Sequence, residues 1–393
     1  MGQRVVLAYS GGLDTSVCVK WLALRGHEVI AFMADVGQGG DFQRLSRRAR
    51  SAGASRVVVR DLTDEFARDF VAPALQANAL YEGKYLLATA LSRPLIAKHL
   101  VEVAHQYRGQ AIAHGCTGKG NDQVRFETTV MALDGRLTII APVREWELTS
   151  RASEIEYAKA HRIPLDITKK SPYSLDENLW GTSIECGILE DPWREPPLDT
   201  YRSVRPVDRT PATPALVEIG FQRGVPSHVN GRKLALVPLI RRLNDLAGVH
   251  GVGRSDLVEN RLVGIKSREV YEAPAGTVLL EAHEELERLV LDRELYHYKQ
   301  TVAVKYSEMV YYGLWFTPLK AALDAFVRDT QQRVSGTVRV KLHRGTAVAV
   351  GRKSPHSRYR QHLATYGQGD QFDQRSAEGF IKLWALPYLE SQK

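Results

Sequence analysis

The sequence predicts an α/β fold in which a doubly wound, parallel five-stranded sheet is followed by an α+β region and a C-terminal helical arm. Short apolar runs alternate with amphipathic segments over the first 165 residues, as strands and helices do in a parallel sheet. Hairpin signals and longer helices follow, and the last thirty residues carry an apolar segment. We therefore expect three domains, 1–165, 166–360 and 361–393.

Five runs of aliphatic and β-branched residues are the expected strands of the parallel sheet. They span residues 5–7, 28–33, 56–60, 111–113 and 137–141. The helical segments are expected at 13–24, 41–53, from 63 onward, at 88–108, after 121 and at 150–161. Gly26 follows the first of these helices and Gly53 ends the second, as glycine commonly does.

The pattern changes after residue 165. Residues 169–174 form a linker-like turn, and the proline-rich segment 191–214 favours extended or loop structure. Asn230-Gly231 predicts a tight hairpin turn. Strands are expected at 216–221, 233–236, 257–266, 336–343 and 346–352, and helices at 238–247 and 277–300. This mixture predicts an α+β domain.

Residues 8–16, Ala-Tyr-Ser-Gly-Gly-Leu-Asp-Thr-Ser, directly follow the first expected strand. A strand, a glycine turn and a helix start direct free backbone N–H groups and the positive end of a helix dipole at one point, which favours an anion. The Walker A lysine and the spaced glycines of the dinucleotide fingerprint are both missing from this loop. Ser-Gly-Gly-x-Asp-Thr/Ser instead resembles the pyrophosphate-binding loop of ATP-pyrophosphatases. A glycine turn without a ligand is the alternative.

Residues 114–122, His-Gly-Cys-Thr-Gly-Lys-Gly-Asn-Asp, form a second glycine-rich loop after an expected strand. Its three glycines expose backbone N–H groups, while Thr117, Asn121 and Asp122 add donors and acceptors. Arg125 lies one helical turn further on the same face. The loop therefore predicts a second site for phosphate or carboxylate groups, with a generic glycine loop as the alternative.

Composition and charge argue against several other classes of protein. The net charge of +8 suits small anionic substrates, and the basic residues are spread along the chain, so we expect no nucleic-acid partner. Three distant cysteines suggest neither a disulfide framework nor a metal site. No apolar run approaches the roughly 18 residues of a membrane span, and the first strand leaves no room for a signal peptide. We expect a cytoplasmic protein.

Several motifs, taken together, are similar to those of the argininosuccinate synthase (citrulline–aspartate ligase) family, in the same order and over essentially the whole chain. They comprise residues 8–16, 85–87, 114–122, 174–179, 251–254 and 258–260. The resemblance implies a Rossmann-like ATP-pyrophosphatase domain, a synthetase domain and a C-terminal oligomerisation arm that builds a homotetramer. It implies condensation of citrulline with aspartate to argininosuccinate, with release of AMP and pyrophosphate, through a citrullyl-adenylate in arginine biosynthesis. ATP is then a substrate that carries Mg²⁺.

The resemblance also assigns residues to the three substrates. For ATP they are Ala8, Tyr9, Ser10, Gly11, Gly12, Leu13, Asp14, Thr15, Ser16, Ala34 and Gly115. For aspartate they are Thr117, Asn121 and Asp122, and for citrulline Tyr85, Asn121, Arg125, Ser174, Ser183, Glu259 and Tyr271. Several relatives carry serine where this chain has Ala90, so position 90 is not assigned.

The charges fit these assignments. Arg125 suits the carboxylate of citrulline, and Glu259 suits its ammonium group. Asp122 is expected either to hold the incoming amine of aspartate or to accept its proton. Asp14 is a candidate contact for the magnesium carried by ATP. Asp14 and Asp122 are thus the two candidate catalytic groups, and the chemistry requires no covalent protein nucleophile.

Alternatives remain open for the residues and for the function. Arg125 and Glu259 are also compatible with structural salt bridges, Ser174 and Ser183 with helix caps, and the two assigned tyrosines with core packing. A tRNA-modifying ATP-pyrophosphatase is the rival enzyme, although paired cysteines for sulfur transfer and a basic RNA-binding module are not evident. A non-catalytic nucleotide-binding protein is the rival from another class.

Overall fold

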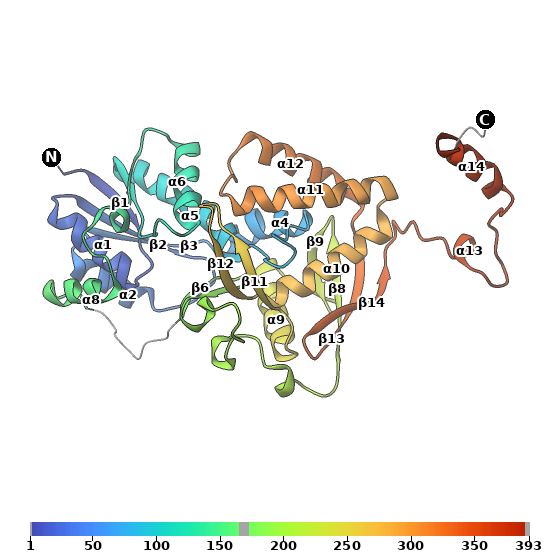
Figure 1. Cartoon of the computed structure of the whole chain (residues 1–393), viewed down its shortest axis with the longest axis horizontal. Helices are drawn as coiled ribbons and strands as arrows, with labels where there is room; N and C mark the ends of the chain where they lie inside the picture. The colour runs from blue at the N-terminus through green and yellow to red at the C-terminus, as the bar shows by residue number, and fades with distance from the viewer. Residues whose placement is uncertain (1, 165–172, 390–393) are drawn as a thin grey trace.

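A computed structural model describes residues 2–164 and 173–389 of the chain. The predicted boundary between residues 165 and 166, and most of the predicted turn at 169–174, lie outside these described residues. Figure 1 shows the parallel sheet at the N-terminal end of the molecule, the antiparallel sheets and long helices beside it, and the C-terminal segment extending away from both.

The predicted parallel five-stranded sheet is confirmed. Its strand order is β3-β2-β1-β4-β5, and all of its strands run parallel. The strands are β1 (Arg4–Ala8), β2 (Glu28–Asp35), β3 (Arg56–Asp61), β4 (Ala111–Ala113) and β5 (Thr138–Ile140). The successive residues of β1 alternate between the two faces, so Val5 and Leu7 pack on one side of the sheet and Val6 on the other.

Helices cover both faces, as a doubly wound fold requires. The face that includes Val5 and Leu7 packs against α1 (Leu13–Leu24), α2 (Phe42–Ala52) and α8 (Arg151–Ala160). The opposite face packs against α5 (Ala88–Tyr107) and α6 (Asp122–Leu133). The shorter segments α3 (Thr63–Glu65), the π-helical η1 (Phe66–Val71) and α4 (Ala72–Gln76) form one continuous helical path, and α7 (Pro142–Glu145) follows β5.

The rest of the described chain contains two antiparallel sheets, of strand orders β10-β9-β8-β13-β14 and β11-β12-β7-β6. Their strands are β6 (Ser174–Glu177), β7 (Thr182–Glu185), β8 (Ala215–Gln222), β9 (Val225–Val229), β10 (Arg232–Lys233), β11 (Arg254–Asn260), β12 (Lys266–Glu272), β13 (Gly336–His343) and β14 (Thr346–Lys353). The helices are α9 (Leu236–Val249), α10 (Pro274–Val290), α11 (Arg293–Tyr311) and α12 (Pro318–Thr330). The predicted α+β character is confirmed.

Three element predictions in this region are wrong. The expected strand 257–266 is a hairpin, because β11 ends at Asn260 and β12 begins at Lys266. The expected helix 277–300 is two helices, since the Asp292 side chain accepts a hydrogen bond from the Leu295 N–H and starts α11 anew. The expected strand 233–236 is reduced to the two residues of β10, and α9 already begins at Leu236.

The hairpin turn predicted at Asn230-Gly231 is confirmed, with φ values of 50° and 76° at these two residues. Ser174 is the first residue of β6, and Ser183 lies within β7. The alternative that these serines cap helices is therefore wrong.

One large apolar core joins the two halves of the molecule. It begins on the α5 face of the parallel sheet and continues into α9, α10 and α11. The C-terminal segment lies outside this core. Its helices α13 (Gln361–Ala364) and α14 (Ser376–Ala385) have no buried residue, and the Trp384 side chain is 64% exposed. The segment is the predicted helical arm.

Candidate active site

A cavity of about 630 Å³ lies at the carboxyl ends of β1, β2 and β4. In the strand order, β1 and β4 are neighbours whose following helices, α1 and α6, lie on opposite faces of the sheet. This is the point at which open α/β sheets bind ligands. The residues that the family resemblance assigns to ATP and that line this cavity are Ala8, Tyr9, Ser10, Gly12, Leu13, Asp14, Thr15, Ala34 and Gly115.

The β1–α1 loop has the geometry of an anion site. Ser16 N donates to Gly12 O at 3.1 Å, which starts the intrahelical ladder and leaves the preceding amide groups without helical acceptors. The hydroxyls of Ser10 and Thr15 lie 3.1 Å apart beside them. Gly11 has a φ of +81°, and a Cβ there would lie 2.4 Å from the Leu45 side chain. The loop therefore needs glycine at position 11.

Two residues of the expected ATP loop do not line the cavity. Gly11 faces Leu45, and the Ser16 hydroxyl is buried, 3.1 Å from the Tyr9 hydroxyl. Burial raises the pKa of Tyr9 above its ordinary value, although Ser16 and Arg48 oppose the shift. These two residues support the shape of the loop.

The β4–α6 loop meets the β1–α1 loop directly. A Cβ at Gly115 would lie 3.1 Å from Thr15 Cγ2, so the absence of a side chain lets the two loops touch. Asp122, at the start of α6, lines the same cavity. Thr117 is exposed at the outer end of this loop and does not line it. The two glycine-rich loops of the sequence thus form one crevice.

Arginine side chains hold Asp122 from both sides. Arg93 Nε donates to Asp122 Oδ2 at 2.9 Å, and Arg125 Nη1 donates to Oδ1 at 2.8 Å. Burial opposes ionisation of the Asp122 carboxyl, but the two guanidinium groups outweigh burial and lower its pKa below its ordinary value. Asp122 is therefore a carboxylate at neutral pH and a weak proton acceptor.

A second cluster brings together residues that are far apart in sequence. Tyr85 and Tyr271 stack with their ring centroids 4.0 Å apart. Tyr271 donates its hydroxyl hydrogen to Glu259 Oε2, and Tyr311 donates to Glu259 Oε1. Asn121 Nδ2 in turn donates to the Tyr311 hydroxyl at 2.7 Å. Four residues assigned to citrulline therefore lie in one buried group.

Glu259 is only 1% exposed. Burial raises the pKa of its carboxyl above the ordinary value, and the two tyrosine hydroxyls and Arg125 partly offset that increase. The carboxylate is thus enclosed by neutral donors that a cation would displace, because a buried charge is most stable when it is paired with an opposite one.

The remaining assigned residues border this cluster. Arg125 Nε donates to the Tyr311 backbone carbonyl at 2.9 Å, and its guanidinium lies 4.8 Å from the Tyr311 ring centroid. The hydroxyls of Ser183 and Thr89 are 2.8 Å apart, and Thr89 N donates to the Tyr85 hydroxyl. Ser174 is exposed, two residues before Asp176 on β6.

Sequence reasoning missed Tyr311, Thr89 and Arg93. Tyr311 lies at the end of α11, far from the residues it contacts, and no local pattern marks it. Thr89 and Arg93 did carry a signal. They are spaced four apart on α5, so they share one face of a helix that is otherwise mostly buried and apolar.

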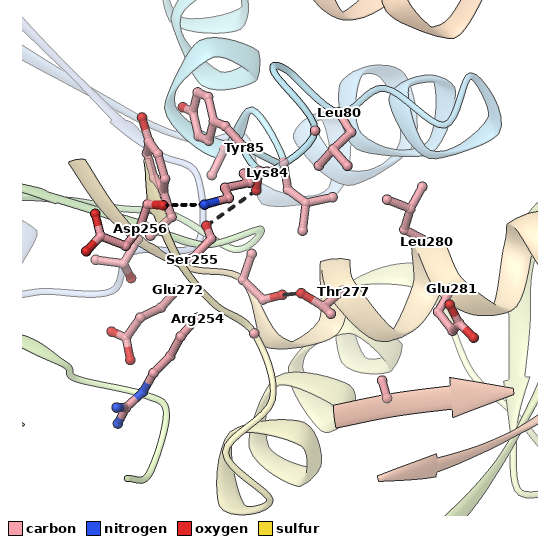
Figure 2. Close-up of a pocket in the computed structure, with 18 of the residues that line it drawn as sticks. Leu80, Lys84, Tyr85, Arg254, Ser255, Asp256, Glu272, Thr277, Leu280 and Glu281 are labelled. Carbon is pink, nitrogen blue, oxygen red and sulfur yellow. Dashed lines mark hydrogen bonds between the residues drawn. The ribbon is translucent and has the colours of Figure 1, made fainter. Parts of the chain in front are cut away.

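A second cavity, of about 550 Å³, lies beyond Tyr85 and Tyr271, between β11, β12 and α10 (Figure 2). Two of its charged groups bond to the backbone: Lys84 Nζ donates to Asp256 O at 3.0 Å, and Glu272 accepts from the N–H groups of Arg202 and Val204. The first cavity, where two glycine loops meet Asp122, is therefore the better candidate for catalysis.

Within residues 2–164 and 173–389, no group of three or more His, Cys, Asp or Glu side chains is arranged to hold a metal ion. No helix in the same part of the chain is long and apolar enough to cross a membrane.

The chain is similar to known proteins over nearly its whole length. Residues 4–164 match the family model described as the arginosuccinate synthase N-terminal HUP domain, and residues 173–390 match the arginosuccinate synthase C-terminal domain. An argininosuccinate synthase of Bacillus pumilus is 56% identical over 98% of this chain and 95% of its own length. The Bacillus subtilis protein of that name is 55% identical with the same coverage, and that of Carboxydothermus hydrogenoformans is 55% identical over 98% and 97%.

Proposed function

The chain belongs to the argininosuccinate synthase family, and we propose that its crevice and its tyrosine–glutamate cluster together catalyse one ligation. The enzyme condenses L-citrulline with L-aspartate and ATP to give argininosuccinate, AMP and pyrophosphate, through a citrullyl-adenylate. It is a carbon–nitrogen ligase of arginine biosynthesis. The observation that carries this proposal is the contact of both glycine loops around one cavity that ends at Asp122.

The chemistry explains why ATP is needed. A ureido carbon is a poor electrophile, because two nitrogens donate into it and its oxygen is a poor leaving group. Attack of the ureido oxygen on the α-phosphorus breaks the bond to pyrophosphate and makes that oxygen part of an AMP leaving group. The amine of aspartate then forms the new C–N bond, and AMP departs. Positioning of the reactants contributes roughly 7–11 kcal/mol to such reactions.

ATP occupies the first cavity, with its phosphates at the start of α1. The amide groups of the first helical turn and the hydroxyls of Ser10 and Thr15 stabilise charge that develops on the leaving pyrophosphate. Ala34 and Gly115 face the nucleotide from the ends of the neighbouring strands. Mg²⁺ arrives on ATP, and the Asp14 carboxylate is an oxygen donor of the kind that this ion prefers.

Citrulline lies between the two halves of the molecule. Its ammonium group pairs with Glu259 and takes the place of tyrosine donors, while Arg125 pairs with its carboxylate. The stacked tyrosines bound the site, and the hydroxyl of Ser183 and the Asn121 amide add neutral contacts. Ser174 approaches the same substrate from the exposed start of β6.

Aspartate enters beside the β4–α6 loop, where Thr117 and Asn121 offer donors to its carboxylates. Asp122 orients the amine of the substrate. Its lowered pKa supports this role over that of a proton acceptor, because a carboxylate held by two guanidinium groups binds a proton weakly.

We also propose a homotetramer in the cytoplasm, without nucleic-acid or membrane partners. The support for oligomerisation is α14, whose apolar side chains are exposed in the single chain and would be buried on a neighbouring subunit. A tRNA-modifying enzyme and a non-catalytic nucleotide-binding protein are less consistent with identities of 55–56% to argininosuccinate synthases over nearly the full length.

One assay tests the proposal. Purified protein is incubated with ATP and Mg²⁺, citrulline and aspartate are omitted in turn, and AMP, pyrophosphate and argininosuccinate are followed by mass. Argininosuccinate that forms only with both amino acids is the expected result. AMP release that depends on tRNA, or no AMP under any condition, contradicts it.

A further inference from the structure

Arg93 is a cation inside the nucleotide cavity that none of the substrate assignments includes. It lies on α5, its side chain is 15% exposed, and it lines the same cavity as Asp14 and Thr15. Its charge is retained despite burial, because Asp122 and Asp176 keep the pKa of the guanidinium above its ordinary value.

The guanidinium joins three elements. Its Nε and Nη2 both contact Asp122 Oδ2, at 2.9 and 2.8 Å, and Nη2 also donates to Asp176 Oδ2 at 2.6 Å. Asp122 begins α6, whereas Asp176 lies on β6 in the other half of the molecule. Arg93 therefore fixes Asp122 against both halves, while Arg125 holds the second oxygen of the same carboxylate.

We propose that Arg93 is a positioning residue for the second step of the reaction. It holds the Asp122 carboxylate so that the amine of aspartate is directed at the adenylated ureido carbon. This inference rests on the proposed function, and it assigns Arg93 no essential part in the first step. A displacement of about 1 Å in such a contact lowers a rate by about a hundredfold.

The charges around Asp122 give a second signature. Arg93 faces it from α5 and Arg125 from its own helix, while Asp176 on β6 and Glu185 on β7 are the nearby acids and the Cys116 thiol is neutral. Burial and the two acids act to raise the pKa of the Asp122 carboxyl. Without Arg93, only Arg125 opposes that increase. The carboxylate then protonates more readily, so the acidic limb of the pH profile of kcat/KM for aspartate moves to higher pH.

The test separates the two chemical steps in Arg93→Met and Arg93→Lys. Single-turnover adenylation is measured by rapid quench with enzyme in excess over labelled ATP, with citrulline present and aspartate absent. The complete reaction is measured as argininosuccinate formation. We expect adenylation to stay within about threefold of the unsubstituted enzyme in both variants. The complete reaction should fall about a hundredfold in Arg93→Met and less in Arg93→Lys, which keeps the charge.

Two further variants control for a structural effect. Arg60→Met removes another arginine that anchors α5, through Glu102, but lies outside the cavity, and should leave both steps unchanged. Asp176→Asn loosens Arg93 from the other side and should lower the second step by about tenfold, with adenylation retained. If Arg93→Met fails to fold, Arg93→Lys and Asp176→Asn carry the same comparison.

Equal losses in both steps, a selective loss of adenylation, an unshifted acidic limb or no effect in the Arg93 and Asp176 variants would overturn this inference. The unsubstituted enzyme tests the proposed function separately. If it forms neither adenylate nor argininosuccinate, the proposed function fails. If it forms both while the Arg93 variants behave like it, only the role of Arg93 fails.

Discussion

The nucleotide crevice and the tyrosine–glutamate cluster are built in different ways. The crevice is lined by loops that directly follow β1 and β4, and its donors are the first amide groups of α1 and short hydroxyl side chains. The cluster draws its members from β11, β12, α11 and the segments just before α5 and α6, and these side chains already satisfy one another, with Tyr271 and Tyr311 both bonded to Glu259.

The two regions therefore differ in how they bind a ligand. Backbone donors at a helix start are held in place by the fold and are ready for an anion before it arrives. The cluster instead exchanges internal hydrogen bonds for contacts with substrate. A substitution at the start of α1 should therefore impair catalysis alone, whereas one in the cluster should also lower the stability of the folded chain, since its contacts hold the two halves together.

Arg125→Ala should have the largest effect, because it acts on both properties. We expect turnover to fall at least about a hundredfold, as the loss of a charge-assisted contact of roughly 3 kcal/mol would cause. Removal of one member of a buried ion pair also costs about 3 kcal/mol of stability, measured by urea unfolding. Arg136→Ala removes a guanidinium that is 89% exposed just after the same helix, where Asp134 keeps its contact with His105, and it should change neither property.

Asp14→Ala should reduce turnover by a similar factor while the stability stays nearly unchanged. Asp14 faces the cavity, and at neutral pH its removal costs the protonated Glu154 only a hydrogen-bond partner. Argininosuccinate formation and the melting temperature, measured on one preparation, check both parts. Asp69→Ala, at an exposed aspartate of η1, is the matched control. A large loss of stability in Asp14→Ala would contradict the distinction between the two regions.

Glu259→Gln should act on one substrate. It removes the charge that meets the citrulline ammonium but keeps an oxygen for the tyrosine hydroxyls. We expect KM for citrulline to rise about thirtyfold, in the range of a lost hydrogen bond to a charged group, while KM for ATP stays within about twofold. Initial rates at varied citrulline and varied ATP measure both constants, and a parallel rise in the two would count against a local role.

Glu154→Gln should have the smallest effect, and it depends on pH. Burial and the hydrogen-bonded Asp14 carboxylate raise the pKa of Glu154 to about 8. A carboxyl whose pKa is raised by folding contributes stability below its unfolded pKa and loses it as pH rises through the folded value. At pH 9 the melting temperature of the variant should therefore be about 2 °C above that of the unsubstituted protein, a small effect because the site is half-buried. At pH 6 the difference between the two melting temperatures should be smaller. Melting curves at several pH values test this, and a constant difference would contradict it.

The sequence predicted the two regions unequally. The loops at 8–16 and 114–122 are each continuous in sequence, so motif and position after a strand were enough to predict each of them as an anion site. Their contact in one crevice is a result of the structure. Within the cluster, Glu259 and Tyr271 were predicted only through the family resemblance. Tyr311 was missed because its contact with Glu259 spans a long stretch of chain that no local period encodes, whereas Arg93 was missed although its spacing from Thr89 on α5 marks it.

The missed turns have the same kind of cause. Residues 262, 263 and 265 are apolar, so the turn between β11 and β12 has the composition of a strand, and only strand pairing separates the two. Leu291 likewise continues the apolar pattern of α10, and the break that follows it depends on the single side-chain contact of Asp292. Overall class and topology were predictable, since strand–helix alternation is repeated along the N-terminal region.

The position of Tyr311 at the end of α11 has a consequence for biosynthesis of the protein. On the ribosome, the last strand of the parallel sheet is complete at Ile140, whereas Tyr311 is added on the order of ten seconds later. Until then the nascent chain contains the loop at residues 8–16 but lacks the Tyr311 hydroxyl that donates to the Glu259 carboxylate. Truncated products that end before α11 would therefore lack one of the two tyrosine donors to Glu259, together with the part of the shared core that α11 supplies.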